Sequence, residues 1–131
     1  MTVVVADASA VVAALLDAGP VGAWASRVLA ASDVAAPHLM PCEASNLVRR
    51  TELRGAVSAP EAAQAHADLV DLAAELFPFE PFAARVWQLR PNVTAYDAWY
   101  IAVAEALDAP LATVDRRLAR AAGVRCDFLL P

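Results

Sequence analysis

The sequence predicts an α/β fold in which helices cover both faces of a mainly parallel β-sheet. Short β-branched or apolar runs alternate with helical segments along the 131 residues, and this alternation is typical of strand–helix–strand units. A parallel sheet needs crossover helices, which bury it on both sides. A chain of this length can bury one substantial core but not two. We therefore expect one domain over residues 1–131, with no repeat or linker.

In the first 54 residues, two strands and three helices are expected. A β-branched run precedes Asp7, a Gly19-Pro20 break separates two helical segments, and Gly55 ends the third. The expected elements are a strand at Val3–Ala6, helices at Ser9–Leu16 and Val21–Ala31, a strand at Val34–Ala36 and a helix at Pro41–Arg54.

Capping residues place the later helices. Ser58 and Glu61 have the spacing of a capping box, and Thr94 has the position of a helix cap three residues before Asp97. The expected elements are a helix from Ser58 to about Leu76, a strand at Phe77–Glu80, a helix from Pro81 to about Leu89, a helix from Thr94 to about Leu107, a strand at Pro110–Val114, a helix at Asp115–Ala122 and a strand at Val124–Leu130.

Apolar residues are abundant, yet their pattern argues against a membrane protein. They make up 60% of the chain, with a mean hydropathy of +0.47, but a spanning helix needs about 20 uninterrupted apolar residues. The runs Ala10–Leu16 and Ala98–Ala104 are both too short. Asp7 interrupts the first apolar run and no basic residue precedes it, which argues against a signal peptide. We expect a soluble, cytoplasmic protein without a membrane partner.

Charge and cysteine content exclude two further classes of protein. The net charge of −5 argues against a broad basic surface for nucleic acid, although all ten basic residues are arginine, which grips phosphate well. Cys42 and Cys126 form no C-x-x-C pair, and two histidines provide no zinc pattern. We expect both cysteines to be buried free thiols in a reducing cytoplasm.

Four acidic residues are the candidate functional residues, although each alone has an ordinary explanation. Asp7 and Asp115 follow expected strands and could cap the next helix. Glu43 and Asp97 lie in first turns of expected helices, where negative charge suits the helix dipole.

Their position in the fold changes this interpretation. In a parallel α/β sheet the carboxyl ends of strands and the amino ends of the following helices meet at one edge, where ligands bind. All four acids belong to that edge. Carboxylates at close range repel one another unless a cation lies between them. Mg²⁺ prefers carboxylate oxygens and also accepts phosphate oxygens. The four acids therefore predict metal-assisted hydrolysis of phosphodiester bonds.

Several neighbouring residues could support such a site. Ser9 could hold a water or a phosphate, Thr113 could support Asp115, and Asn46 could orient Glu43 from the same helix face. Arg116 directly follows Asp115 and is the preferred phosphate contact. The other arginines are more typical of solvated helix faces. The aromatic residues are more typical of core or interface packing; these are Trp24, Trp87, Trp99 and Tyr100.

Four segments together resemble the PIN-domain family, and more narrowly the VapC-type toxins of bacterial toxin–antitoxin pairs. These segments are Val3–Ala10, Pro41–Val48, Thr94–Glu105 and Pro110–Leu118. The resemblance covers essentially the whole chain, and the order and spacing of the four acids make it specific. The stretch Ser58–Leu89 follows the family only in being helical.

The resemblance implies a three-layer α/β/α sandwich and a ribonuclease that uses Mg²⁺, with Mn²⁺ as a possible substitute. It implies that Asp7, Glu43, Asp97 and Asp115 bind the metal, Asp7 and Asp97 most directly. It also implies inhibition by a cognate antitoxin, and a homodimer. The sequence leaves the target RNA open.

Two other functions are compatible with parts of this pattern. A response-regulator-like phosphoacceptor would need a lysine, and the chain has none. A non-catalytic PIN-like binding module would have lost the chemistry, whereas all four acids are present here.

Overall fold

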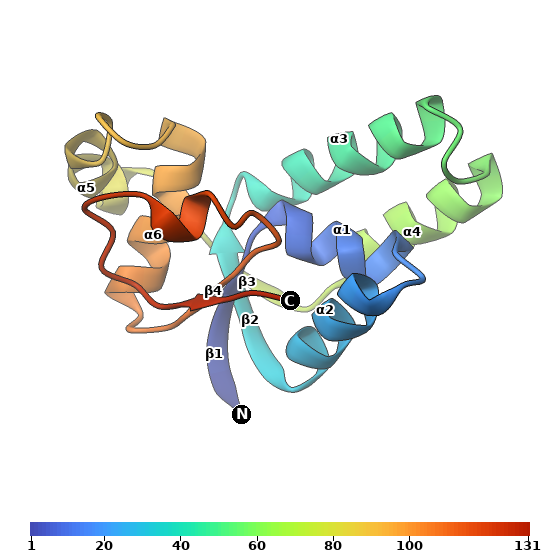
Figure 1. Cartoon of the computed structure of the whole chain (residues 1–131), viewed down its shortest axis with the longest axis horizontal. Helices are drawn as coiled ribbons and strands as arrows, with labels where there is room; N and C mark the ends of the chain where they lie inside the picture. Colours follow the sequence, from blue (N-terminus) through green and yellow to red (C-terminus); the bar gives the residue numbers. More distant parts are fainter.

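A five-stranded, entirely parallel sheet forms the centre of the structure, a computed structural model that describes residues 1–131 (Figure 1). The strands are β1 (Thr2–Ala6), β2 (Ser32–Pro37), β3 (Ala74–Phe77), β4 (Leu111–Ala112) and β5 (Phe128–Leu129). Their order in the sheet is β3-β2-β1-β4-β5, so the chain builds outward on one side of β1 and then on the other. In open α/β sheets, ligands bind where the strand order reverses in this way. Here that point lies beyond the carboxyl ends of β1 and β4.

Six α-helices and two short 3₁₀ turns connect the strands. Side-chain caps define several helix starts, as expected: Ser58 and Glu61 form the capping box, and the Thr94 hydroxyl accepts the Asp97 N–H. The helices are α1 (Ala8–Leu16), α2 (Pro20–Ala30), α3 (Met40–Leu53), α4 (Ala59–Asp71), α5 (Ala83–Gln88) and α6 (Ala95–Ala106), with turns η1 (Glu80–Phe82) and η2 (Leu118–Arg120).

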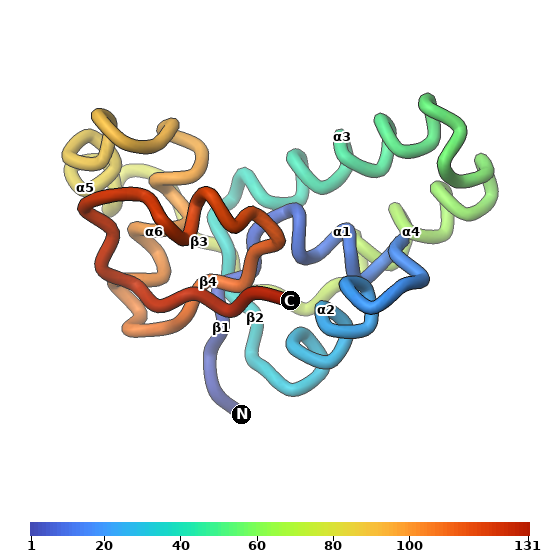
Figure 2. The backbone as a smooth tube through the Cα atoms, viewed as in Figure 1, coloured from blue at the N-terminus to red at the C-terminus, as the bar shows by residue number.

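The helices lie on both sides of the sheet and confirm the predicted three-layer arrangement. Helix α6 packs against β1 and β2, with α5 beside it, while α1 and α2 cover the other side (Figure 1). Helices α3 and α4 form a hairpin that projects away from the sheet (Figure 2). Helix α6 is apolar almost all round, and its side chains from Ala98 to Ala104, apart from Trp99, are at most 3% exposed. Such a helix is stable only when it is enclosed.

The prediction for the third strand was wrong in position. A helix was expected to reach Leu76, with a strand at Phe77–Glu80, whereas α4 ends at Asp71 and the strand is Ala74–Phe77. The residues from Ala73 to Leu76 favour a helix in isolation. They are extended because β2 offers a free edge, to which they add as a parallel strand.

The elements near the carboxyl end are shorter than predicted. The expected helix Asp115–Ala122 is only the 3₁₀ turn η2, and the expected strand Val124–Leu130 pairs only at Phe128–Leu129. Ala121 already has an extended backbone, and Gly123 reverses the chain at φ 84°. The predicted helix at Pro81–Leu89 likewise divides into η1 and α5.

A bidentate ion pair anchors this irregular segment. Arg85 of α5 donates to Glu105 of α6 at 2.7 and 3.0 Å and to the Gly123 carbonyl at 2.7 Å. The Arg125 N–H donates to Glu105 at 2.7 Å. Burial opposes ionisation of Glu105, but its hydrogen bonds with Arg85 and Arg125 prevail and lower its pKa. The loop before β5 is therefore held by charged hydrogen bonds in place of regular structure.

No single helix is long and apolar enough to cross a membrane. Helices α1 and α2 reach that length and apolarity only as a pair, and the pair is bent by 111°.

Both cysteines are free, as expected, but Cys42 is exposed and Cys126 is only half-buried. The expectation that both are buried was wrong for Cys42, which is exposed in the first turn of α3.

Truncation of Ile101 tests the importance of the buried helix α6. Its side chain is 0% exposed, so we expect Ile101→Ala to lower the free energy of unfolding by about 2–5 kcal/mol, through lost apolar burial and a new cavity. Urea denaturation measures this change. Leu53→Ala is the control, because Leu53 is 67% exposed and its truncation should cost less than about 0.5 kcal/mol. Similar losses for both variants would contradict the enclosure of α6 in the core.

Candidate active site

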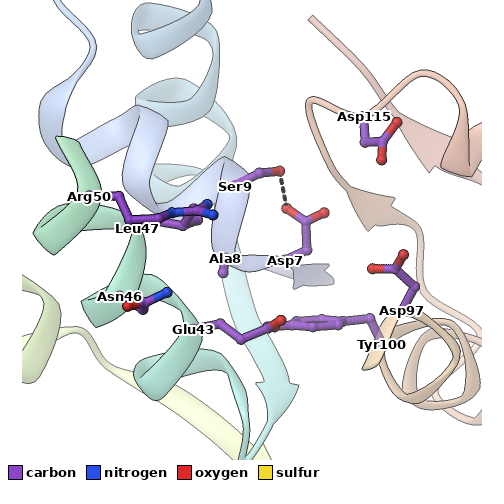
Figure 3. A pocket seen from close by; sticks show the side chains of 10 residues that line it. All are labelled: Asp7, Ala8, Ser9, Glu43, Asn46, Leu47, Arg50, Asp97, Tyr100 and Asp115. Carbon is purple, nitrogen blue, oxygen red and sulfur yellow. Dashed lines mark hydrogen bonds between the residues drawn. The ribbon is translucent and has the colours of Figure 1, made fainter. Parts of the chain in front are cut away.

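One pocket collects all four predicted acids at the carboxyl edge of the sheet (Figure 3). Its volume is about 430 Å³. The acids come from four different parts of the chain: the end of β1, the first turns of α3 and α6, and the segment after β4. The lining residues are Asp7, Ala8, Ser9, Glu43, Asn46, Leu47, Arg50, Asp97, Tyr100 and Asp115.

Asp7 is the most buried of the four acids, at 8% exposure. It caps α1, and its Oδ1 accepts the Ala10 N–H at 2.9 Å and the Ser9 hydroxyl at 2.5 Å. Both bonds use one oxygen, and the other faces the pocket (Figure 3). Burial raises the pKa of Asp7, although hydrogen bonds from Ser9 and Thr113 oppose this shift. Asp7 is thus both a helix cap and a wall of the pocket.

Thr113 and Ser9 join the ends of β1 and β4. Thr113 is fully buried, and its hydroxyl accepts the Asp115 N–H at 3.0 Å and lies 3.5 Å from the Ser9 hydroxyl. The Ser9 hydroxyl also accepts the Val114 N–H at 3.3 Å. Asp115 in turn caps the following turn through the Arg117 and Leu118 N–H groups. The predicted supporting positions of Ser9 and Thr113 are therefore part of one hydrogen-bonded network.

Asp97 lies in the first turn of α6 and is half-buried. Burial raises the pKa of Asp97, and the charges of Asp7, Glu43 and Asp115 raise it further. The three other acids are therefore near enough to Asp97 for their charges to disfavour its ionisation.

Glu43 reaches across the pocket to Tyr100. The Tyr100 hydroxyl donates to Glu43 Oε1 at 2.7 Å, and the Tyr100 side chain is 2% exposed. The sequence interpretation assigned Tyr100 to core packing and missed this contact. The spacing could have indicated it, because Tyr100 follows Asp97 by three residues and therefore shares its helix face.

The basic residue in the pocket is Arg50, whereas the sequence interpretation favoured Arg116. Arg116 donates to the Pro131 carbonyl at 2.6 Å and does not line the pocket. Arg50 follows Glu43 and Asn46 on one face of α3, and its guanidinium extends toward the pocket (Figure 3). Arg50 forms no ion pair. The chain has two ion pairs, and these are Arg85–Glu105 and Arg117–Asp115.

The residues of the pocket fit a divalent cation by their chemistry. Four carboxylates supply the hard oxygen donors that Mg²⁺ and Mn²⁺ accept. No three of the acids are near enough to one another to hold one ion as they stand. Burial first, and then the charges of the other three acids, raise the pKa of Asp97, and a bound cation would oppose both effects. Ligation by three acids would therefore require side-chain rotation into the pocket.

The chain matches known proteins over nearly its whole length. The family model described as the PIN domain matches residues 4–124. "Ribonuclease VapC1" from Mycobacterium tuberculosis is 42% identical over 127 residues, which cover 96% of each chain.

Solved structures share the fold at lower identity. The crystal structure of Mycobacterium tuberculosis VapC20, a toxin that cleaves the sarcin–ricin loop, superposes with a TM-score of 0.68 and 16% identity. That match covers 93% of this chain and 96% of VapC20. VapBC-5 of the same organism, a member of the VapBC family of toxin–antitoxin systems, has a TM-score of 0.59 and 24% identity, and covers 99% and 98% of the two chains. This chain belongs to the PIN-domain family and, within it, to the VapC-type proteins.

Proposed function

We propose that the chain is an endoribonuclease that acts as the toxin of a toxin–antitoxin pair and hydrolyses RNA phosphodiester bonds. The observation that carries the proposal is the convergence of four acids from four separate segments on one pocket. The 42% identity to a VapC ribonuclease over nearly the whole chain supports RNA as the substrate. In the reaction, water adds to phosphorus and the P–O3′ bond breaks, which leaves a 5′-phosphate and a 3′-hydroxyl.

Asp7, Glu43, Asp97 and Asp115 would hold Mg²⁺, or Mn²⁺ in its place, with Asp7 and Asp97 as the most direct ligands. A divalent cation in such a site activates water and stabilises the leaving oxygen. The protein's own contribution is to fix the donors. Ser9 and the Ala10 N–H orient the Asp7 carboxylate, and the Tyr100 hydroxyl holds Glu43. Asn46 lines the pocket one turn beyond Glu43.

The acidic pocket needs a cationic element to attract a polyanion. Arg50 supplies a guanidinium at the pocket without an internal partner, and arginine binds phosphate through two parallel hydrogen bonds. Arg50 therefore replaces Arg116 as the proposed contact with an RNA phosphate.

The proposed partners follow from the family. The acidic pocket suits a cationic segment of a cognate antitoxin, and the VapBC structure supports such a partner. A homodimer and a cytoplasmic location complete the proposal. A non-catalytic module is disfavoured because all four acids line the same pocket.

Neutralising the acids tests the catalytic assignment. We expect Asp7→Asn and Asp97→Asn each to abolish RNA cleavage, because each removes a charged ligand for the cation. Cleavage of a labelled RNA measures the loss, and circular dichroism checks the fold. Excess EDTA should abolish wild-type cleavage, and added Mg²⁺ should restore it. Undiminished cleavage in EDTA, or by both variants, would contradict the metal mechanism.

The raised pKa of Asp97 predicts a stability cost that depends on pH. Folding favours the protonated carboxyl, so ionised Asp97 lowers stability at neutral pH, and this cost disappears as the pH falls through the raised pKa. Asp97→Asn should therefore raise the Tm of the metal-free protein near neutral pH. The gain should shrink toward about pH 4, where the wild-type carboxyl also becomes neutral. Thermal melts in EDTA measure both values, and a lower Tm of the variant at neutral pH would contradict the predicted cost.

Arg50→Ala tests the phosphate contact. In an Asp7→Asn background, which allows binding without cleavage, we expect weaker RNA binding. The slope of log affinity against log salt should fall in magnitude by about one, because one phosphate contact is lost. Fluorescence anisotropy at several salt concentrations measures this slope. Arg49→Ala is the matched control, since Arg49 is also exposed but does not line the pocket. Equal effects of the two substitutions would contradict a specific role for Arg50.

A further inference from the structure

The hydrogen bond between Tyr100 and Glu43 joins the two walls of the acidic pocket. Glu43 belongs to α3 and Tyr100 to α6, and no other side-chain hydrogen bond connects these two helices. In the pocket the Tyr100 ring extends from α6 toward the Glu43 carboxylate (Figure 3). The Tyr100 hydroxyl on α6 therefore determines where the Glu43 side chain of α3 lies.

The direction of this bond follows from the chemistry of the two groups. The Tyr100 hydroxyl carries a proton and is 2% exposed, whereas an ionised Glu43 carboxylate offers only acceptor oxygens. The hydroxyl is therefore the donor. Glu43 Oε1 accepts this hydrogen bond at 2.7 Å, and Oε2 has no partner within the chain. A long, flexible side chain is thus held by one oxygen while the other stays available.

Packing of the ring does not explain the hydroxyl. The ring is part of the main core cluster, and phenylalanine would fill the same volume. A buried hydroxyl is unfavourable unless it is hydrogen-bonded, and its partner here is one of the four pocket acids. The hydroxyl therefore contacts a pocket acid, while the ring packs in the core.

We propose that Tyr100 is a positioning residue, whose hydroxyl orients the Glu43 carboxylate for a divalent cation and so raises the affinity of the pocket for that cation. This role rests on the proposed metal-dependent function. Groups that orient a ligand from behind commonly change metal affinity by about 10- to 100-fold. Tyr100 acts through Glu43, and its contribution should disappear when Glu43 is absent.

The test measures Mn²⁺ binding to the purified protein by isothermal titration calorimetry. We expect Tyr100→Phe to weaken Mn²⁺ binding by roughly 10-fold, while the metal-free Tm stays close to the wild-type value because the ring remains packed. Tyr96→Phe is the matched control. Tyr96 is on the same helix, but it is 62% exposed and its hydroxyl has no partner in the chain, so Mn²⁺ binding should not change.

A double-mutant cycle separates positioning from a purely structural effect. In a Glu43→Ala background, Tyr100→Phe should cause no further loss of Mn²⁺ affinity. Unchanged Mn²⁺ binding by Tyr100→Phe alone, or an equal loss with and without Glu43, would overturn the positioning role while leaving the proposed function intact. Absence of Mn²⁺ binding by the wild-type protein would overturn the proposed function and the positioning role with it.

Discussion

The placement of four carboxylates in one partly buried pocket is the constraint on which the rest of this structure depends. Burial and three neighbouring acids raise the pKa of Asp97, and burial raises that of Asp7, so ionisation of these two groups costs folding free energy at neutral pH. The fold tolerates this cost because apolar burial is concentrated elsewhere, above all along α6 and the central strand β1. Helix α6 carries both properties, since its first turn holds Asp97 and the turns that follow lie in the core.

Each acid is kept in place by ordinary local structure. Asp7 caps α1, and Asp115 caps the turn after β4. Glu43 accepts a hydrogen bond from the buried Tyr100 hydroxyl. The capping interpretation of Asp7 is compatible with the proposed function because both local hydrogen bonds use Oδ1, while the other oxygen faces the pocket. A helix cap fixes a side chain at the amino end of a helix, and in a parallel sheet that end lies at the ligand-binding edge. Local folding rules thus deliver the acids to a common pocket.

Much of the fold and the acid set could be predicted, because both follow from short-range patterns. The β-branched run before Asp7, the capping box at Ser58 and the Thr94 cap correspond to observed elements. The position of β3 could not be predicted, because it depends on the free edge of β2 and not on the propensity of its own residues. Tyr100 and Arg50 were missed although their spacing places them on the same helix faces as Asp97 and Glu43. A helix face can be read from spacing, but the groups that lie across the pocket from it cannot.

Arg116 and Arg50 illustrate the difference between adjacency in sequence and adjacency in space. Arg116 is next to an acid in the chain, yet the turn that Asp115 caps directs its guanidinium to the Pro131 carbonyl. Arg50 is seven residues from Glu43, which is two helical turns along one face of α3, and it lines the pocket. The regular helix α3 therefore places a residue seven positions from Glu43 at the pocket, whereas the irregular turn directs the residue next to Asp115 elsewhere. The acids depend on strand ends and helix caps, and the surrounding contacts depend on the faces of α3 and α6 that the hydrogen bond between Tyr100 and Glu43 joins.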